Sequence, residues 1–177
     1  MTDGAILQSE LLQATEYWWH LARQHWYQPL RHSNCPSVQF DLRGRCAGQL
    51  RLRRTLPGLK PELIRYNLVL AANNETDFIE QTVPHEVAHA VAVILHGRAG
   101  TGHGAGWREV MHFFGKPLTR CHDYDVSAVA ARRTRKFPYR CHCAVEHHLG
   151  SIRHRRMQTG ERIYQCRKCK AILSLAL

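Results

Sequence analysis

Long hydrophobic runs are missing from this chain of 177 residues. No apolar stretch approaches the roughly 20 residues that a membrane-spanning helix needs, so we expect no membrane partner. The N-terminus also lacks the basic cluster and small-residue cleavage site of a secretory signal, and Asp3 stands near its start. We therefore expect a cytoplasmic protein, in which the seven cysteines are thiols or metal ligands rather than disulfides.

Acidic residues are scarce in the C-terminal part of the chain. Residues 126–177 contain twelve Lys and Arg but only Glu146 and Glu161, whereas residues 1–125 contain thirteen Lys and Arg against twelve Asp and Glu. A solvated basic tail is the ordinary explanation of such an excess. Positive charge also favours phosphate binding through counterion release. Because aromatic residues and cysteines share this segment, we favour a nucleic acid as its partner.

Hydrophobic periodicity predicts a helix followed by a small sheet. Apolar residues recur every three or four positions over residues 6–26, which is the spacing of an amphipathic helix. Apolar and polar residues alternate over residues 38–42, 50–52 and 64–70, which predicts three strands, and residues 55–62 are expected to form a loop. Helices follow this short antiparallel sheet. Such segregation of strands and helices along the chain is typical of an α+β fold.

The sequence HEVAH at residues 85–89 predicts a metal site on a helix. Residues four apart lie on one helix face, so His85 and His89 can bind one Zn²⁺. Glu86 is placed to act as general base on a water molecule. A charged Glu buried in this apolar run costs several kcal/mol without a partner, and a cation supplies one. Taken alone, the motif is equally compatible with chance histidines on a solvated helix face.

A third histidine decides how this motif is interpreted. His96 lies seven residues beyond His89, about 10.5 Å along the same helix, which is too far for one ion. His103 lies within the glycine-rich segment 97–106, whose backbone can return sharply over the helix. A second helix is expected to follow, with Trp107 in the core. Three histidines with one open position form the ligand set of a hydrolytic zinc site, while the alternative for His103 is a solvated loop position.

Two cysteine pairs in the C-terminal segment predict a second, structural zinc site: Cys141, Cys143, Cys166 and Cys169. The second pair has the C-x₂-C spacing of a zinc knuckle, whereas the first pair is one residue shorter. Residues 151–164 between the pairs predict two strands around a turn, which favours a zinc-ribbon-like hairpin. A histidine could replace one cysteine of the first pair, with His147 as the alternative, and His142 and His148 also within reach. Four reduced cysteines without metal are the simpler explanation.

Other polar and reactive residues receive structural interpretations. Three further cysteines are interpreted as buried or incidental thiols: Cys35, Cys46 and Cys121. The polar stretch RCHDYD at residues 120–125 is expected at a helix end rather than among the catalytic residues. By residue type alone, Tyr66, Tyr124 and Arg120 are candidates to stabilise a developing oxyanion.

Five segments of the chain resemble the SprT family, which is related to the Spartan-type zinc metalloproteases. In the order of the family, they are IRYN at 64–67, FIEQTVPHEVAHAV at 78–91, HGAGW at 103–107, FPYRCHC at 137–143 and YQCRKC at 164–169. The resemblance implies a zincin-like metalloprotease domain with His85, His89 and His103 on a catalytic Zn²⁺ and with Glu86 as the catalytic acid and base. It also implies a small zinc-binding element at the C-terminus.

We therefore expect a zincin-like domain over residues 1–130 and a basic zinc-ribbon-like domain over residues 131–177. Spartan-type relatives cleave proteins crosslinked to DNA, so the resemblance implies a zinc-dependent metalloendopeptidase that acts on DNA-associated or DNA-crosslinked proteins. In this mechanism, Glu86 takes a proton from zinc-activated water and gives it to the leaving amine. Two alternatives stay open: a nucleic-acid-binding zinc adaptor or regulator with little protease turnover, and a zinc hydrolase with a non-peptide substrate.

With the resemblance, the nucleic acid is expected to be DNA, single-stranded or structured. Basic and aromatic residues of the second domain are expected to bind it, with cations on phosphates and rings stacked on exposed bases. The candidates are Arg132, Arg133, Arg135, Lys136, Phe137, Tyr139, Arg140, Arg153, Arg155 and Arg156, with Tyr164 as a further aromatic residue.

Overall fold

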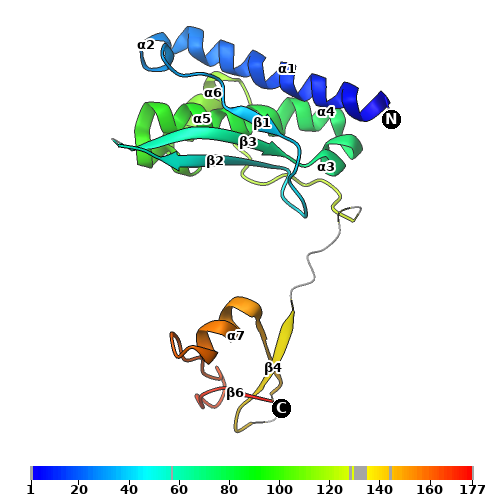
Figure 1. Ribbon diagram of the computed structural model, residues 1–177, viewed down its shortest axis with the longest axis vertical. Coiled ribbons are helices and arrows are strands. Elements are labelled where there is room, and N and C mark those ends of the chain that lie inside the picture. Colours follow the sequence, from blue (N-terminus) through cyan, green and yellow to red (C-terminus); the bar gives the residue numbers. More distant parts are fainter. Residues whose placement is uncertain (1, 57, 128, 130–134, 144, 177) are drawn as a thin grey trace. The chain divides into compact units, whose positions relative to one another are not determined.

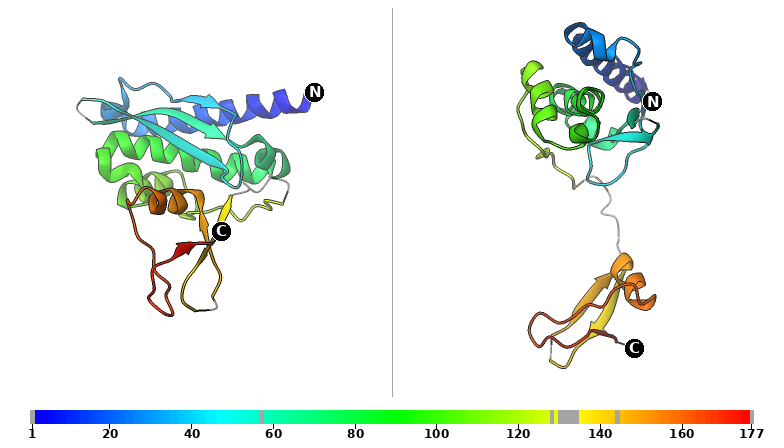
Figure 2. Two further views of the ribbon diagram at one scale, coloured as in Figure 1. Left: turned by 60° about the horizontal axis from the view of Figure 1, so that its bottom comes forward. Right: turned by 90° about the vertical axis from the view of Figure 1, so that its left-hand side faces the viewer.

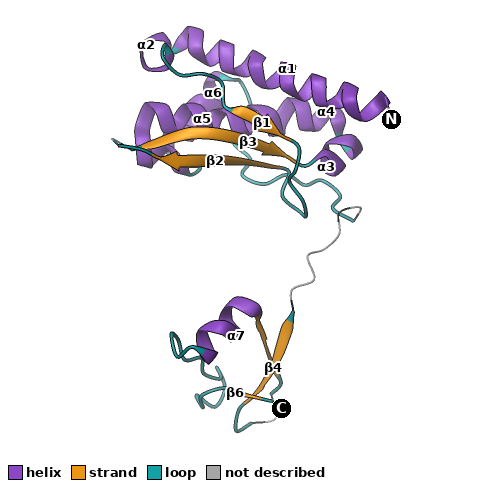
Figure 3. Ribbon diagram, viewed as in Figure 1, coloured by secondary structure: helices purple, strands orange, loops and turns teal. Residues whose placement is uncertain are grey.

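The chain folds into two compact units with separate hydrophobic cores. A computed structural model describes residues 2–56, 58–127, 129, 135–143 and 145–176. The N-terminal unit comprises Met1–Ala131 and the C-terminal unit Arg132–Leu177 (Figure 1). Helices and strands occur in both units (Figure 3), so the mixed α+β composition expected from the sequence is confirmed. The predicted boundary between residues 130 and 131 lies outside the described residues.

A long amphipathic helix begins the N-terminal unit. Helix α1 spans Thr2–His25 and confirms the helix predicted over residues 6–26, and the short helix α2 (Tyr27–Leu30) follows it. Trp19 is buried in the core, whereas Trp18 is half-buried and packs on Phe114 with 4.9 Å between the ring centroids. The two neighbouring tryptophans therefore take one core position and one position at its edge.

The N-terminal unit contains a three-stranded sheet in the order β1–β3–β2. Strand β1 (Ser37–Gln39) is parallel to the central strand β3 (Leu59–Tyr66), and β2 (Gly48–Arg54) is antiparallel to it. The expectation of a purely antiparallel sheet is wrong, because the chain passes from β1 to the far edge strand before it returns through the centre. Among the described residues, β2 pairs on one side only and therefore has a free edge.

Strand β3 begins and ends earlier than the alternation of apolar residues predicted. Its first residues, Leu59–Glu62, were expected in a loop. Pro61 pairs with Leu52 at a bulge between Arg51 and Leu52, where the missing backbone N–H is tolerated.

The other end of β3 is set by Asn67. Its side chain accepts hydrogen bonds from the backbone N–H groups of Val69 (3.1 Å) and Leu70 (3.4 Å), and this caps helix α3 (Leu68–Asn73). The expectation of a strand through residue 70 is therefore wrong. Two leucines spaced two apart fit a helix start as well as a strand, and the Asn cap decides between them.

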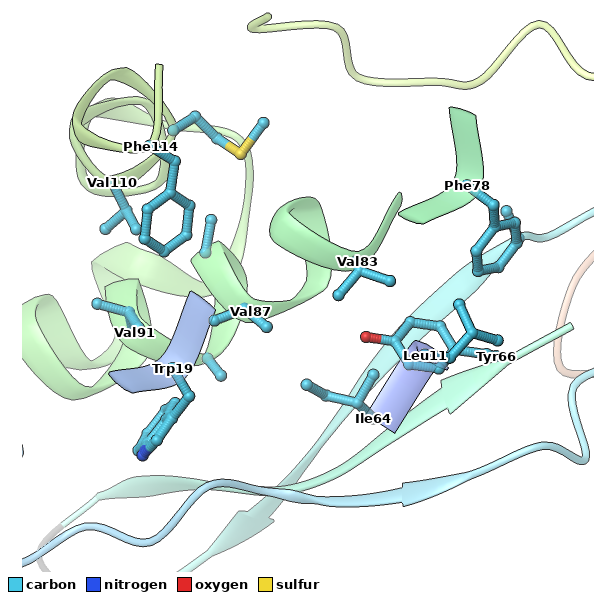
Figure 4. Close-up of a cluster of buried hydrophobic side chains, with 14 of the residues drawn as sticks. Leu11, Trp19, Ile64, Tyr66, Phe78, Val83, Val87, Val91, Val110 and Phe114 are labelled. Carbon is cyan, nitrogen blue, oxygen red and sulfur yellow. The ribbon is translucent and has the colours of Figure 1, made fainter. Parts of the chain in front are cut away.

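Helices pack against one face of this sheet. The segments after α3 are α4 (Glu75–Asp77), the π-helical turn η1 (Phe78–Thr82), α5 (Val83–His96), the 3₁₀ turn η2 (Gly97–Thr101) and α6 (Ala105–Phe113). Helix α5 is the centre of the core, since it contacts α1, α6, β2 and β3. Figure 4 shows side chains from these elements, among them Trp19, Ile64 and Val110, gathered around Val87 and Val91 of α5. No helix among the described residues is long and apolar enough to cross a membrane.

The C-terminal unit is built on a second three-stranded sheet, in the order β5–β4–β6. Strand β4 (Lys136–Arg140) pairs antiparallel with β5 (His147–Gly150) and with β6 (Ser174–Leu175). Figure 2 shows helix α7 (Ser151–Gln158) beside these strands.

Helix α7 replaces the strand that was expected to begin at residue 151. Its Arg, Met and Gln residues favour a helix, and with two apolar residues it offers little alternation for a strand. His154 and Gln158, which are four residues apart, both lie within hydrogen-bonding distance of the Tyr139 hydroxyl, at 3.0 and 3.2 Å. The helical spacing therefore fixes α7 to the unit's core.

Candidate metal centre

Three histidine rings converge between helix α5 and the segment that follows η2. His85 and His89 lie one turn apart on α5, and His103 precedes α6. The Nε2 atom of His89 lies 3.2 Å from that of His85 and 3.2 Å from that of His103, and the Nε2 atoms of His85 and His103 are 3.0 Å apart. The structure therefore brings together the three histidines that the sequence singled out.

Hydrogen bonds alone cannot satisfy these three nitrogens. Each neutral Nε2 either donates or accepts, so at least one of the three pairs must place two donors or two acceptors together. One cation can accept all three lone pairs. Tetrahedral Zn²⁺ with nitrogens at about 2.0–2.1 Å separates those nitrogens by about 3.3 Å, close to the distances seen here. The geometry therefore fits a metal ion.

Burial keeps two of these rings unprotonated, as metal ligands must be. Burial, together with a smaller effect of the neighbouring His103, lowers the pKa of His85 to about 4. Burial also lowers the pKa of His89 to about 3, with smaller effects of the other two histidines. Both rings are therefore unprotonated at neutral pH, and their lone pairs are available to a cation.

Close backbone packing holds His103 over the helix. A Cβ atom added to Gly100 would lie 2.1 Å from the carbonyl oxygen of Ala92, so only glycine allows η2 to approach α5 so closely. Trp107 is buried beneath the site, where its Nε1 donates to the carbonyl oxygen of His85 at 3.3 Å. Its ring centroid lies 4.6 Å from that of His103. The predicted packing role of Trp107 is confirmed.

Glu86 is buried between the histidines and strand β2. Its side chain packs so closely on Gly48 that a Cβ atom there would lie 2.5 Å from Cγ of Glu86. Burial raises the pKa of the Glu86 carboxyl to about 8, and the backbone of Leu50 partly offsets this effect. A carboxyl group held beside the three imidazoles, with a pKa near neutrality, suits proton transfer.

Two other histidines near this site do not belong to the cluster of three. The Nε2 atom of His96 lies 3.0 Å from a carboxylate oxygen of Glu109 on α6, away from the other three rings. His112 on α6 is exposed to solvent. The exclusion of His96 from the ligand set is therefore confirmed by its position.

An open cleft of about 670 Å³ leads to the histidines. Residues of β2 from Gly48 to Leu52 form one side, and residues 117–126 contribute to the opposite lining. Across it, the Nε2 atom of His122 lies 3.0 Å from the carbonyl oxygen of Arg45. At its inner end, the hydroxyl groups of Tyr124 and Thr82 are 2.9 Å apart.

The stretch RCHDYD therefore lies along the cleft. The expectation that it lies at a helix end is wrong. Arg120 and Tyr124 line the cleft, which keeps both available as oxyanion candidates. Tyr66 is not available, because its hydroxyl group is buried against the Thr15 hydroxyl at 3.0 Å. The dense run of polar residues was the signal for this part of the cleft, but nothing in its spacing indicates which way it faces.

The isolated cysteines are less buried than expected. Cys46 and Cys121 are exposed and both line the cleft, so of the two predicted interpretations, buried or incidental thiols, burial does not apply to them. Cys35 is half-buried, and burial raises the pKa of its thiol to about 12. The two exposed thiols lie on opposite segments that the cleft brings together.

A second cluster of ligand atoms lies in the C-terminal unit. The four sulfur atoms of the two cysteine pairs all lie within 4.8 Å of one another: Cys141, Cys143, Cys166 and Cys169. The first pair follows β4, and the second lies in a turn that is closed by a bridge between Gln165 and Ile172. Tetrahedral Zn²⁺ with sulfurs at about 2.3 Å separates those sulfurs by about 3.8 Å. The separation of 3.7 Å between Cys143 and Cys166 fits that arrangement.

Although the first pair has the shorter sequence spacing, its two sulfur atoms lie together with those of the second pair. His147, the alternative ligand, lies with its Nε2 atom 3.3 Å from the sulfur of Cys141, beside the cluster of four sulfurs. Its ring is therefore placed to donate a hydrogen bond to that sulfur. Four thiolates that approach one another in this way need a cation to offset their charge.

The expected nucleic-acid residues fall into three groups. Arg132 and Arg133 lie outside the described residues. The basic residues Arg135, Lys136, Arg140, Arg153 and Arg155 are exposed, and Arg156 is half-buried beside Glu161 at 3.3 Å.

The aromatic residues are less available than their sequence positions suggested. Tyr139 is buried in the core of the unit, so its ring cannot stack on a base. Phe137 is half-buried, with one contact to the parallel ring of His154 at 3.6 Å between centroids and another to the Arg135 guanidinium group. Tyr164 is also half-buried. Alternation in a strand places every second side chain inward, which accounts for Tyr139.

Comparison with known proteins agrees with the motifs. A sequence model of the SprT-like family matches residues 19–127. Protein SprT of Pasteurella multocida is 38% identical over 146 residues, which cover 82% of this chain and 81% of the relative. Protein SprT of Pseudomonas aeruginosa is 40% identical over 154 residues, 85% of each chain, and that of Pseudomonas paraeruginosa is 41% identical over 142 residues, 78% and 79%. No solved structure matches the chain. The family match and these identities together show that the chain belongs to the SprT-like family.

Proposed function

We propose that the N-terminal unit is a zincin-like, zinc-dependent metalloendopeptidase. The observation that carries this proposal is the set of three Nε2 atoms within 3.0–3.2 Å of one another, with Glu86 in the next position along α5. All four residues line one open cleft, so a substrate can reach them. When bound there, Zn²⁺ supplies Lewis acidity that activates water and polarises a carbonyl group.

The protein's own groups carry the proton transfers. Glu86 accepts a proton from the attacking water and then gives it to the leaving amine nitrogen. Burial raises the pKa of its carboxyl, which makes the carboxylate a stronger base in the first transfer than an exposed Glu would be. Arg120 and Tyr124 line the cleft and are the candidates to donate hydrogen bonds to the carbonyl oxygen as negative charge develops on it.

The free edge of strand β2 suits an extended peptide. Residues Gly48 to Leu52 line the cleft, and this strand pairs with β3 on its other side. A peptide added to this edge would form backbone hydrogen bonds and would pass the histidines in extended form. Such binding depends little on side chains, which agrees with a peptidase of broad sequence tolerance.

The C-terminal unit is proposed to hold a structural Zn²⁺ and to bind DNA, single-stranded or structured. The four cysteine sulfurs supply the ligand set, and the exposed arginines of β4 and α7 supply the contacts to phosphates. A peptidase joined to a DNA-binding unit acts on proteins that are bound or crosslinked to DNA, and we propose these as its substrates.

Metal analysis and cleavage of a DNA-bound protein test this function together. Purified metal-replete protein is incubated with a DNA-binding protein, with and without DNA, alongside the variants Glu86→Gln and Glu75→Gln. Glu75 is an exposed acid on α4 and serves as the matched control. We expect cleavage by the wild-type and Glu75→Gln proteins, none by Glu86→Gln, and the same zinc content in all three.

The outcomes also separate the alternatives. A protein that binds zinc and DNA but cleaves no protein substrate supports the adaptor, and this would refute the peptidase. Cleavage that is unchanged in Glu86→Gln would show that another group transfers the proton. Turnover of a small ester or amide without turnover of proteins would favour a hydrolase with a non-peptide substrate.

A further inference from the structure

Positive charge in the N-terminal unit is concentrated in one segment of the sequence, which contains strand β2. Residues 43–60 contain six Arg and Lys and no Asp or Glu, whereas the other residues up to 125 contain seven Arg and Lys against twelve Asp and Glu. All six basic side chains are exposed: Arg43, Arg45, Arg51, Arg53, Arg54 and Lys60. Residues 43–60 are therefore a basic segment on a unit that is otherwise acidic. Glu62 of β3 follows this segment and pairs with Arg53 at 3.5 Å.

A recess of about 780 Å³ lies between the end of this hairpin and turn η2. Arg54 of the hairpin and Arg98 of η2 both line the recess, and no acidic residue does. Among the described residues, neither arginine forms an ion pair or a side-chain hydrogen bond. Two unpaired arginines that face one acid-free recess form a site for an anion.

The recess adjoins the cleft of the metal centre. Thr101 lines both hollows, and Leu52 of the cleft and Arg54 of the recess lie two residues apart on β2. An anion bound between the two arginines therefore lies near one end of the strand edge where a substrate peptide is proposed to bind.

We propose that Arg54 and Arg98 bind backbone phosphates of a single-stranded nucleic acid, so that the N-terminal unit contacts nucleic acid independently of the C-terminal unit. This inference rests on the proposed function, because a peptide crosslinked to DNA brings phosphates and a peptide backbone to the same place. Six exposed basic side chains over residues 43–60, of which Arg53 is paired with Glu62, suit a repeating polyanion better than a single carboxylate.

Binding of a fluorescent oligothymidylate to the full-length protein at several salt concentrations tests the inference. The variant Arg54→Ala/Arg98→Ala is compared with Arg31→Ala/Arg108→Ala, which removes two exposed arginines elsewhere on the unit and has the same net charge. Loss of two phosphate contacts lowers the slope of log affinity against log salt by about 1.4, at about 0.7 per contact on single strands. We expect this change, with a weaker affinity, in the recess variant only, and the same zinc content in both.

Each possible result of this experiment leads to a different conclusion. Equal affinity and slope in the two variants, with tight binding by the wild-type protein, would refute the recess and leave the proposed function intact. If the wild-type protein binds no oligothymidylate, the proposed nucleic-acid function fails as a whole. If the recess variant loses cleavage of an acidic peptide but binds oligothymidylate like its control, the recess holds carboxylates and the inference is wrong.

Discussion

Gly48 of strand β2 lies against the side chain of Glu86, with room for a hydrogen atom but not for a methyl group. A Cβ atom at this position would lie 2.5 Å from Cγ and 2.6 Å from Oε1 of Glu86. The edge strand therefore sets the position of the proposed general base, and glycine is the one residue that allows it.

Substitution Gly48→Ala is expected to displace Glu86 and to slow catalysis. A displacement near 1 Å at a catalytic group can reduce turnover by about 100-fold. We expect kcat to fall by roughly 10- to 100-fold while zinc content is unchanged, since Glu86 is not a ligand. Gly58→Ala is the matched control, because no atom lies within 4 Å of a Cβ added there. Full activity of Gly48→Ala would contradict the positioning role.

The metal-free protein is expected to lose stability relative to Glu86→Gln as the pH rises. The pKa of Glu86 is raised from 4.5 to about 8 in the folded state. The stabilisation by its bound proton is therefore complete below the unfolded pKa and is lost as the pH rises toward 8. Urea unfolding in the presence of a chelator, followed by tryptophan fluorescence, measures this difference. It amounts to several kcal/mol at about 1.4 kcal/mol per pKa unit.

Tryptophan fluorescence suits this measurement because Trp18, Trp19, Trp26 and Trp107 all lie in the N-terminal unit. The signal therefore reports on the unit that contains Glu86. Parallel stability profiles of wild-type and Glu86→Gln proteins between about pH 5 and pH 8 would show that the carboxyl is not held as described.

Two zinc ions per chain are expected in metal-replete protein. His89→Ala removes one of the three converging nitrogens and should leave one ion, in the cysteine cluster. His112→Ala, which changes an exposed histidine of α6, should retain both. Inductively coupled plasma mass spectrometry gives the ratio. Equal zinc in these two variants would be inconsistent with a metal centre at the histidines.

The exposed arginines of α7 are expected to contribute to DNA binding. The variant Arg153→Ala/Arg155→Ala should bind single-stranded DNA more weakly, with a salt slope smaller by about 1.4. Arg162→Ala/Arg167→Ala changes two exposed arginines of the same unit outside α7 and serves as control. Wild-type protein should prefer single-stranded or frayed DNA to a perfect duplex. Identical slopes for both variants would place the contact elsewhere.

Local sequence patterns were sufficient where a residue's role depends on near neighbours. The spacing of His85 and His89 on one helix face, and the glycines around His103, indicated three converging rings, and the structure brings them together. The period of α1 likewise indicated its length and its buried face.

Patterns failed where a tertiary contact decides between two local structures. Leu68 and Leu70 fit a strand or a helix, and the hydrogen bonds of Asn67 select the helix. In α7 the Tyr139 hydroxyl, which binds two residues one helical turn apart, adds to the helix preference of the Arg, Met and Gln residues. The direction in which residues 120–125 face depends on contacts such as that of His122 with Arg45, 77 positions away, which no local period encodes.

The two units have hydrophobic cores of different size, so we expect their folded states to respond differently when zinc is scarce. The C-terminal unit buries only four side chains among its described residues: Tyr139, Leu149, Cys166 and Leu173. This core is too small for the unit to fold without a bound metal. The N-terminal unit has an extensive core of its own around α5. As zinc becomes limiting, the C-terminal unit would unfold while the tryptophans of the N-terminal unit keep their native environment. On the proposed function, zinc scarcity would then leave a folded N-terminal unit without its catalytic metal and an unfolded C-terminal unit without its proposed DNA-binding surface, and resupplied metal would refold only the smaller unit.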